Sequence, residues 1–346
     1  MFIVDAKIKL NNKELDKDVY NNLKAIKVST SINALSVAKL AFHDPFGDLQ
    51  EDSNFDIGKD ISIDIGYKDY TNIFKGIIAR VDFDFSKGRS VTAHLVCYDK
   101  LYKLSKMVHS RPFIKMKDSE IAKKMASEGG LQCSVDATSK KHDYIFQNNE
   151  SNLDFLRRRA DLLGYELTVD DGKMIFKKGR FKDKKKSVDL SWWRTLIDFH
   201  AKVDSNKIIE EAVVSSWDYV KKKELSEKKK AGDEPKVGSA SKMGTKEVKS
   251  NLKNKTKNYR IDIPNLQSGE AKEIAKASLT TSSMEYLKVT GTCEGEPKIK
   301  AGKVILVENV GKKLTGEYYI TSCEHIYTGA SFRTHFDAVT NGTHKN

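Results

Sequence analysis

The side chains that could do chemistry lie far apart in this sequence of 346 residues. Its eight histidines fall at positions 43, 94, 109, 142, 200, 325, 335 and 344, and no two have the HExxH spacing of a zinc hydrolase. No GxSxG turn, P-loop or dinucleotide fingerprint is present. Asp82 and Asp84 have strand spacing on one face, which is ordinary for an exposed strand. This spacing does not identify the paired carboxylates of a glycosidase. We therefore expect no catalytic, cofactor-binding or metal-binding residues and no enzyme.

The four cysteines, Cys97, Cys133, Cys293 and Cys323, each lie in a strand-like run without CxxC or CxxH spacing. This pattern is typical of small buried thiols in a reducing compartment and argues against disulfides and a metal site. No apolar run approaches the roughly 18 residues of a membrane helix, and residues 1–16 alternate apolar and charged positions, unlike a signal peptide. We therefore expect no membrane contact.

Most of the net charge of +13 lies in residues 221–258, which hold 13 lysines, five acidic residues and no aromatic residue. Such a stretch buries too little apolar surface to offset its ordering entropy, so the sequence predicts a mobile lysine-rich insertion. A basic arm that binds nucleic acid is the alternative. The absence of interleaved aromatic and arginine residues disfavours it.

The elements around this insertion are mainly strands. Residues 1–107 alternate apolar and polar positions between regular turns, which predicts a first β-barrel or sandwich. Residues 108–187 switch to helical spacing twice and predict a small α+β domain. Its second helix starts at Ser151, which has capping-box spacing to Asp154, and ends at Gly164, before a hairpin turning at Asp171-Gly172. Residues 188–220 and 259–346 return to strands.

Two distant stretches, residues 58–97 and 302–338, resemble each other. The matched positions are Gly58 with Gly302, Ile61 with Ile305, Ile63 with Val307, Gly66 with Gly311, Gly88 with Gly329, Ser90 with Ser331, His94 with His335 and Leu95 with Phe336. This repeat predicts two related β-barrel domains flanking the α+β domain. The alternative is two unrelated meanders that share alternation and glycine turns.

Two sets of residues resemble the late control D family, the central hub proteins of contractile phage tails, which includes the amino-terminal part of the type VI secretion spike protein VgrG. The first set is Ser151, Leu153, Asp154, Phe155, Leu156 and Arg158 with Leu163, Gly164 and Tyr165; the second runs from Ala301 to Val307 and from Gly316 to Ile320 and His325. The resemblance covers nearly the whole chain apart from the lysine-rich insertion.

The resemblance implies a structural baseplate hub of a phage tail or R-type bacteriocin. It implies a homotrimer whose six barrels form a nearly sixfold ring that adapts a threefold spike to the sixfold tube. The expected partners are a separate spike protein, because fused spikes continue past the last strand here, and a tail tube or tube-initiator protein and baseplate proteins. No contact with nucleic acid is expected, apart from its possible passage through the lumen of the ring. Assembly would occur in the bacterial cytoplasm, with release by lysis.

The predicted functional residues form surfaces. Arg157, Arg158 and Arg159 are expected to be exposed and are candidates for a subunit or baseplate contact; a solvated helix face is the alternative. Unpaired strand edges are candidates for ring closure. The alternative functions are a tail-associated cell-wall hydrolase and, less favoured, a basic nucleic-acid-binding protein that uses residues 221–258.

Overall fold

The computed structural model describes residues 4–86, 91–181, 186–219, 222–252, 257–263, 266 and 268–344. The strands are β1 (Asp5–Leu10), β2 (Lys13–Glu14), β3 (Leu23–Ser31), β4 (Val37–Asp44), β5 (Asp60–Gly66), β6 (Tyr70–Asp84), β7 (Val91–Asp99), β8 (Val108–Lys117), β9 (Cys133–Val135), β10 (Lys141–Ser151), β11 (Tyr165–Asp170), β12 (Lys173–Lys178), β13 (Asp189–Ser191), β14 (Leu196–Val203), β15 (Ile209–Asp218), β16 (Lys223–Lys230), β17 (Lys242–Met243), β18 (Lys257–Asp262), β19 (Leu287–Glu294), β20 (Val304–Glu308), β21 (Gly316–Tyr327), β22 (Phe332–Thr340) and β23 (Gly342–Thr343). The helices are α1 (Lys17–Asn21), α2 (Tyr102–Ser105), α3 (Asp118–Glu128), α4 (Asn152–Leu163), α5 (Gly244–Leu252) and α6 (Ser268–Ser283), with short 3-10 turns at Asp48–Gln50 and Ser53–Phe55. The chain is mainly β, as the alternation predicts.

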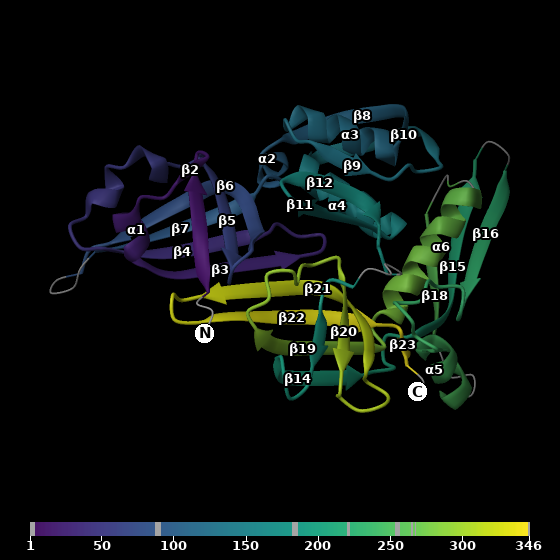
Figure 1. Ribbon diagram of the computed structural model, residues 1–346. Coiled ribbons are helices and arrows are strands. Elements are labelled where there is room, and N and C mark those ends of the chain that lie inside the picture. The colour runs from purple at the N-terminus through teal and green to yellow at the C-terminus, as the bar shows by residue number, and fades with distance from the viewer. Residues whose placement is uncertain are drawn as a thin grey trace.

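One large sheet connects the two ends of the chain. It runs in the order β14-β19-β22-β21-β3-β4-β7-β6-β5-β1-β2, with β20 on β21 and β13 on β20. Figure 1 shows its amino-terminal half on the left, its carboxyl-terminal half below, and the contact between β3 and β21 where they meet. Each half has its own apolar core, one around Ile63 and one around Val307.

The expectation of two separate barrels needs correction. Among the described residues, strand pairing closes neither half into a ring; the halves instead share one open sheet. The reason is physical: period-two alternation identifies strands and their buried face, but it does not say which distant edge each strand pairs with.

Strand register agrees with the sequence repeat at Ile61 with Ile305, Ile63 with Val307, and Leu95 with Phe336. β5, β6 and β7 form the same antiparallel meander as β20, β21 and β22. The bulge between Ile78 and Arg80 recurs between Ile320 and Ser322. In each copy a glycine with positive φ donates its backbone amide to the carbonyl of the last residue before the bulge. Gly58 donates to Ile78 (2.7 Å), and Gly302 donates to Ile320 (2.9 Å).

The correspondence extends to two strands that the sequence comparison missed. β3 and β4 pair with a bulge between Leu23 and Ala25, and β14 and β19 pair with one between Leu196 and Asp198. Each pair continues into the meander, β4 on β7 and β19 on β22, in the same register. Each half of the chain therefore holds the same run of four strands, β3-β4-β7-β6 and β14-β19-β22-β21.

The glycines that the sequence comparison matched are needed for different structural reasons. Gly311 and Gly329 have positive φ, which favours glycine in a turn. Gly66 does not; a Cβ there would lie 2.1 Å from the carbonyl oxygen of Asp69. Gly88 lies outside the described residues.

The α+β unit places its helices against small sheets. The predicted second helix is α4: Ser151 caps it by accepting the amide of Asp154 (3.0 Å), and Gly164 ends it at φ +65°. Its apolar side packs with α3 and the hairpin β11–β12 in a third core that contains Phe113, Phe155 and Phe176. The local signals for this unit were sufficient because cap, apolar stripe and stop lie within one short stretch.

The expectation of a mobile lysine-rich insertion is wrong for residues 222–252 and 257–258. These residues include β16, which pairs with β15 along its whole length, helix α5, and the start of β18. Leu225 packs against a core formed by β15 and α6, so the segment takes its apolar contacts from other parts of the chain. Residues 220–221 and 253–256 lie outside the described residues. None of the helices in the described part of the chain is long and apolar enough to cross a membrane.

Candidate assembly surfaces

The junction between the two halves shows how one repeat docks on the next. β3 pairs antiparallel with β21 from Ser31 opposite Ser322 to Ile26 opposite Tyr327. On the exposed side, Lys27 Nζ lies 2.7 Å from Glu324 Oε2. On the other side, Tyr327 is 5% exposed and packs into the amino-terminal core. A backbone ladder, an ion pair and an apolar contact thus act together.

His325 supports this junction from inside the second half. Its ring is buried; Nε2 lies 3.0 Å from the carbonyl oxygen of Ile299 and Nδ1 lies 2.9 Å from Thr334 Oγ1. Since a carbonyl only accepts, Nε2 carries the proton and Nδ1 accepts from the threonine. Burial lowers the pKa of His325 to about 4. This histidine is a neutral structural group and not a general base.

Acidification from pH 6.5 to pH 4 is expected to destabilise the fold through His325. The unfolded chain binds a proton on this side chain near pH 6.5, whereas the folded chain does so only near pH 4. The free energy of unfolding should therefore fall by up to about 3 kcal/mol as the pH drops through this interval. Burial raises the pKa of Asp99 to about 6, which acts in the opposite direction. The measurement is therefore the Tm difference between wild type and His325→Gln; a difference that is constant from pH 7 to pH 4 contradicts the assignment.

The three arginines of α4 do not form a free basic patch. Arg159 is buried, and its Nε lies 2.5 Å from Asp118 Oδ1, so the expectation that it is exposed is wrong. Arg158 is about half exposed and lies 2.6 Å from Glu150. Arg157 lies 3.6 Å from Asp154 on its own helix. All three contact carboxylates of the same chain, and a contact of Arg157 or Arg158 with another subunit stays a prediction.

Arg159 belongs to a buried polar cluster that sequence reasoning missed. His142 Nε2 lies 2.7 Å from Asp118 Oδ2, and Lys140 Nζ lies 3.3 Å from Glu270 Oε2. Arg159 Nη2 lies 3.7 Å from Glu270 Oε1. Burial acts to raise the pKa of Asp118, but the hydrogen bonds from His142 and Arg159 outweigh it and leave the pKa lowered. The cluster connects α6 to the α+β unit. No sequence motif could have predicted it, because Glu270 is more than 100 residues away from Asp118, Lys140, His142 and Arg159 in the sequence.

The residues examined for catalysis do not assemble a reaction centre. Burial raises the pKa of the Cys97 and Cys293 thiols to about 12, so both stay protonated at neutral pH and are poor nucleophiles. The exposed His94 lies 3.5 Å from Asp84. Within the described residues, no group of three or more histidines, cysteines and acidic residues could hold a metal ion.

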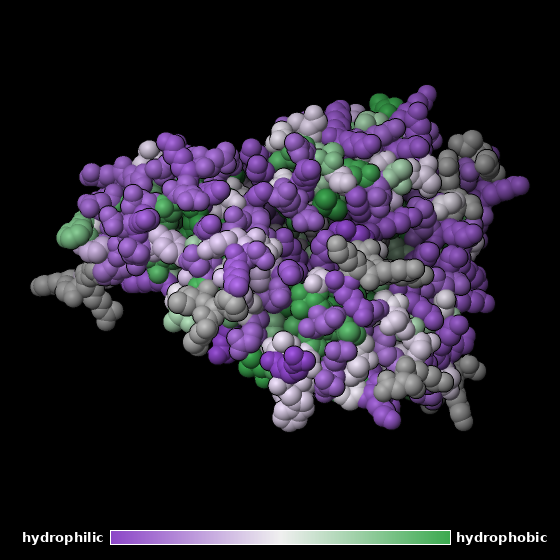
Figure 2. Space-filling view, viewed as in Figure 1, coloured by the Kyte–Doolittle hydropathy of each residue, from purple (hydrophilic) through white to green (hydrophobic). Residues whose placement is uncertain are grey.

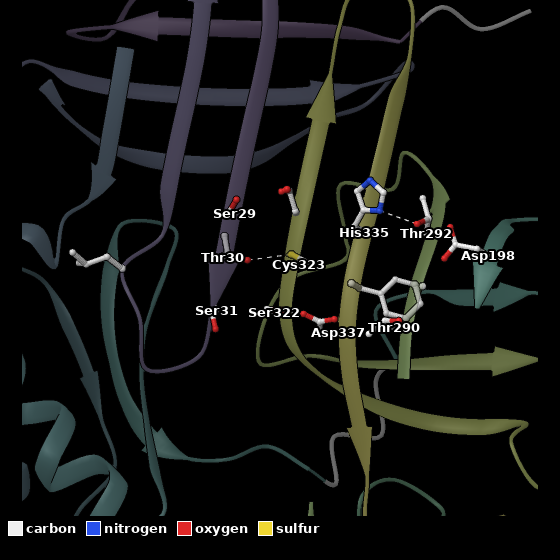
Figure 3. A pocket seen from close by; sticks show the side chains of 14 residues that line it. Ser29, Thr30, Ser31, Asp198, Thr290, Thr292, Ser322, Cys323, His335 and Asp337 are labelled. Atoms are coloured by element: carbon white, nitrogen blue, oxygen red, sulfur yellow. Dashed lines mark hydrogen bonds between the residues drawn. The ribbon is translucent and has the colours of Figure 1, made fainter. Parts of the chain in front are cut away.

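A polar cavity of about 470 Å³ lies over the junction and is lined by side chains of β3, β14, β19, β21 and β22. Figure 3 shows its hydroxyl-rich lining, with His335 bonded to Thr292 (2.7 Å) and Thr30 to Cys323 (3.1 Å). Ser322 donates to Asp337 (2.5 Å).

One ribbon carries an exposed apolar surface. β8 pairs with β10, and Ile114 lies opposite Tyr144, whose ring stacks on Phe146 at 6.2 Å. These three side chains are 60%, 62% and 40% exposed. The face in Figure 2 is otherwise largely hydrophilic, with apolar residues in separate patches.

Comparison with solved structures extends over the whole chain. The 43 kDa tail protein of prophage MuSo2 from Shewanella oneidensis is 14% identical, with 98% of both chains covered and a TM-score of 0.71. A tail protein from Neisseria meningitidis MC58 is 12% identical over 98% of this chain and 97% of that one (TM-score 0.73). The E. coli c3393 protein, a type VI secretion component described as similar to the phage T4 tail proteins gp27 and gp5, is 10% identical over 98% and 79% (TM-score 0.64).

These matches confirm at the level of the fold the resemblance to tail hub proteins. The model of a protein family described as the Alg8 N-terminal domain matches residues 1–328. No match is found among curated protein sequences.

Proposed function

The chain belongs to the Alg8 N-terminal domain family, and we propose that it is a structural hub in the baseplate of a contractile injection particle, a phage tail or an R-type bacteriocin. The fold shared with tail proteins over nearly the whole chain supports this proposal. The particle would assemble in the bacterial cytoplasm.

The observation that carries the proposal is the duplicated four-strand run. A homotrimer of this chain contains six such runs, so a ring that is threefold in chains presents a nearly sixfold surface. Such a ring can join a threefold spike to a sixfold tube. The partners are then a separate spike protein, a tail tube or tube-initiator protein and baseplate proteins.

The proposed role is non-enzymatic. It needs defined surfaces and no reactive group, which agrees with the buried thiols and with a cavity lined by hydroxyls. The nucleic-acid alternative loses its premise of a free basic arm, since residues 222–252 are folded against β15. Three of their lysines, Lys228, Lys230 and Lys249, lie beside carboxylates of β15, with Lys228 at 3.7 Å from Glu211.

The test is to measure the mass of the purified chain in solution by light scattering. The chain is measured alone and after co-expression with a candidate spike protein. We expect a particle of three chains of 39.1 kDa, alone or on the spike. A folded chain that remains monomeric in both preparations contradicts the proposal.

A further inference from the structure

Two strand edges of the chain lack the partner that their repeat equivalents have. β21 pairs with β20 along its first part and with β3 along its second part. Its equivalent β6 pairs with β5 along its first part, but from Arg80 to Asp84 the same edge carries no strand among the described residues. β14, the equivalent of β3, is the outermost strand of the sheet, and beyond an isolated bridge from Trp192 to Leu196 its outer edge pairs with no strand in the described part of the chain.

We propose that these two edges bind each other between copies of this chain: β14 of one copy pairs antiparallel with the second part of β6 of its neighbour, in the register that joins β3 to β21. The inference deepens the proposed function and rests on it for the number of copies in the ring. Three junctions would then lie within chains and three equivalent ones between chains.

The repeat fixes the register. Bulge positions align β3 with β14 and β21 with β6 residue by residue. The pair Ser31–Ser322 becomes Asp204 opposite Arg80, and the pair Ser29–Glu324 becomes Lys202 opposite Asp82.

The charges on these edges agree with that register, although the register was derived without them. Arg80 faces Asp204, Asp82 faces Lys202, and on the same face Asp84 faces His200. Their counterparts at the internal junction include the uncharged pair Ser31–Ser322, so the charge pattern is not simply inherited from the repeat. In the free chain each strand neutralises itself, with Arg80 and Asp82 at 2.9 Å and Lys202 and Asp204 at 2.9 Å. Antiparallel pairing opposes these two patterns with unlike charges throughout.

The opposite face of the same edges is apolar: Val81, Phe83, Phe199 and Ala201 pack partly against the two cores, and the last side chain on each edge is exposed. Phe85, the equivalent of the buried Tyr327, is 62% exposed, and Val203 is 56% exposed. In the proposed register Val203 lies opposite Val81, and Phe85 lies opposite Phe199, as Tyr327 lies opposite Ile26 within the chain. Pairing therefore covers two large exposed apolar side chains and satisfies two open backbone edges.

The contact is head to tail. The two edges differ from each other and lie far apart in one chain, with β14 along the lower border of the sheet and β6 in its upper left part (Figure 1). A contact between unlike edges closes only as a ring or grows as a filament. The ring is the form that the proposed hub requires.

A disulfide can test the register. At the internal junction, the Ile32 amide donates to the Thr321 carbonyl (3.0 Å), which makes Ser31–Ser322 a non-hydrogen-bonded pair and, two residues on, Ser29–Glu324 another. Lys202 and Asp82 inherit this kind of pairing. Such pairs bring Cα atoms to about 4.5 Å, within the range that a disulfide spans.

The experiment uses the full chain with Asp82→Cys and Lys202→Cys, mildly oxidised and separated on a non-reducing gel. We expect covalent species of two and three chains that disappear on reduction. The matched control pairs Asp82→Cys with Asp198→Cys, four residues from Lys202 on the same strand and about 13 Å away. It should stay uncrosslinked, as should wild type, in which Cys97, Cys293 and Cys323 are buried and Cys133 is half-buried.

Charge exchange supplies a second measurement, because the side chains of Asp82 and Lys202 are exposed and their replacement leaves the cores intact. Asp82→Lys should reduce the trimer fraction at least tenfold at low salt, and adding Lys202→Asp should restore it. A trimer that forms without the crosslink and ignores both charge changes overturns this interface and leaves the hub standing. A chain that is monomeric alone and with its spike overturns the hub and the interface together.

Discussion

A chain carrying Ile63→Asp is expected to lose its folded amino-terminal half. Ile63 is fully buried in the first core and lies between Ile8 on β1 and Phe74 on β6. A carboxylate there would be buried without a partner, and it can escape the cost only by protonation or by unfolding. The penalty of several kcal/mol is comparable to the roughly 5–15 kcal/mol of stability that a folded protein has.

Its neighbour Ser62 supplies the control. Ser62 points to the other face of β5, between Lys9 and Lys75 on the adjacent strands, so Ser62→Asp adds a carboxylate beside two amines. Soluble expression, circular dichroism and Tm measure both variants. The Ser62→Asp chain should keep its Tm within a few degrees, and Val307→Asp at the equivalent place in the second core should behave like Ile63→Asp. A folded, assembling Ile63→Asp chain contradicts the assignment of this core.

The sequence predicts elements whose signals are local. The bounds of α4 follow from Ser151 and Gly164, and the structure places the cap and the left-handed stop at those residues. The sequence also indicates that the meander β5–β6–β7 recurs near the carboxyl terminus, because glycines and apolar alternation recur there in the same order. In each case the residues that determine the conformation lie within one turn or one strand of each other.

The failures concern contacts between distant residues. Residues 222–252 are too polar to form a core of their own, but Leu225 packs against apolar residues of β15 and α6. The pairing of β3 with β21 joins residues from opposite ends of the chain, and alternation is the same whichever edge a strand pairs with. Composition measures what a segment can bury by itself, not what the rest of the chain offers it.

The same limit applies to the strand edges. The sequence predicts that strand edges close a ring, but it does not say which edges, because free and paired edges look alike in a single strand. In the described part of the chain, β3 pairs with β21, whereas no strand pairs with the equivalent edges of β14 and of the second part of β6. A run of three arginines is a visible sequence signal for a contact surface, whereas alternating charges such as those of β6 and β14 are common on exposed strands. The proposed pairing of β14 with β6 follows from the register of the repeat and not from these charges.

Replacing Arg159 by methionine is expected to destabilise the contact between the α+β unit and α6 by about 3–5 kcal/mol, because Asp118 and Glu270 would keep buried charge without their guanidinium partner. The matched Arg158→Met removes an exposed ion pair with Glu150 and should cost no more than about 1 kcal/mol. Thermal unfolding measures the loss of stability in each variant, and amide hydrogen exchange shows whether that loss is located in α6.

A double-mutant cycle separates this internal role from an assembly contact. Asp118→Asn combined with Arg159→Met should cost clearly less than the two single changes added together, since each change removes the other's unpaired charge. If Arg158 contacts another subunit, as the sequence predicts, Arg158→Met lowers the trimer fraction and leaves the Tm nearly unchanged. The buried position of Arg159 predicts the reverse: a loss of stability in the isolated chain, before any second copy is bound, with α6 exchanging its amides first.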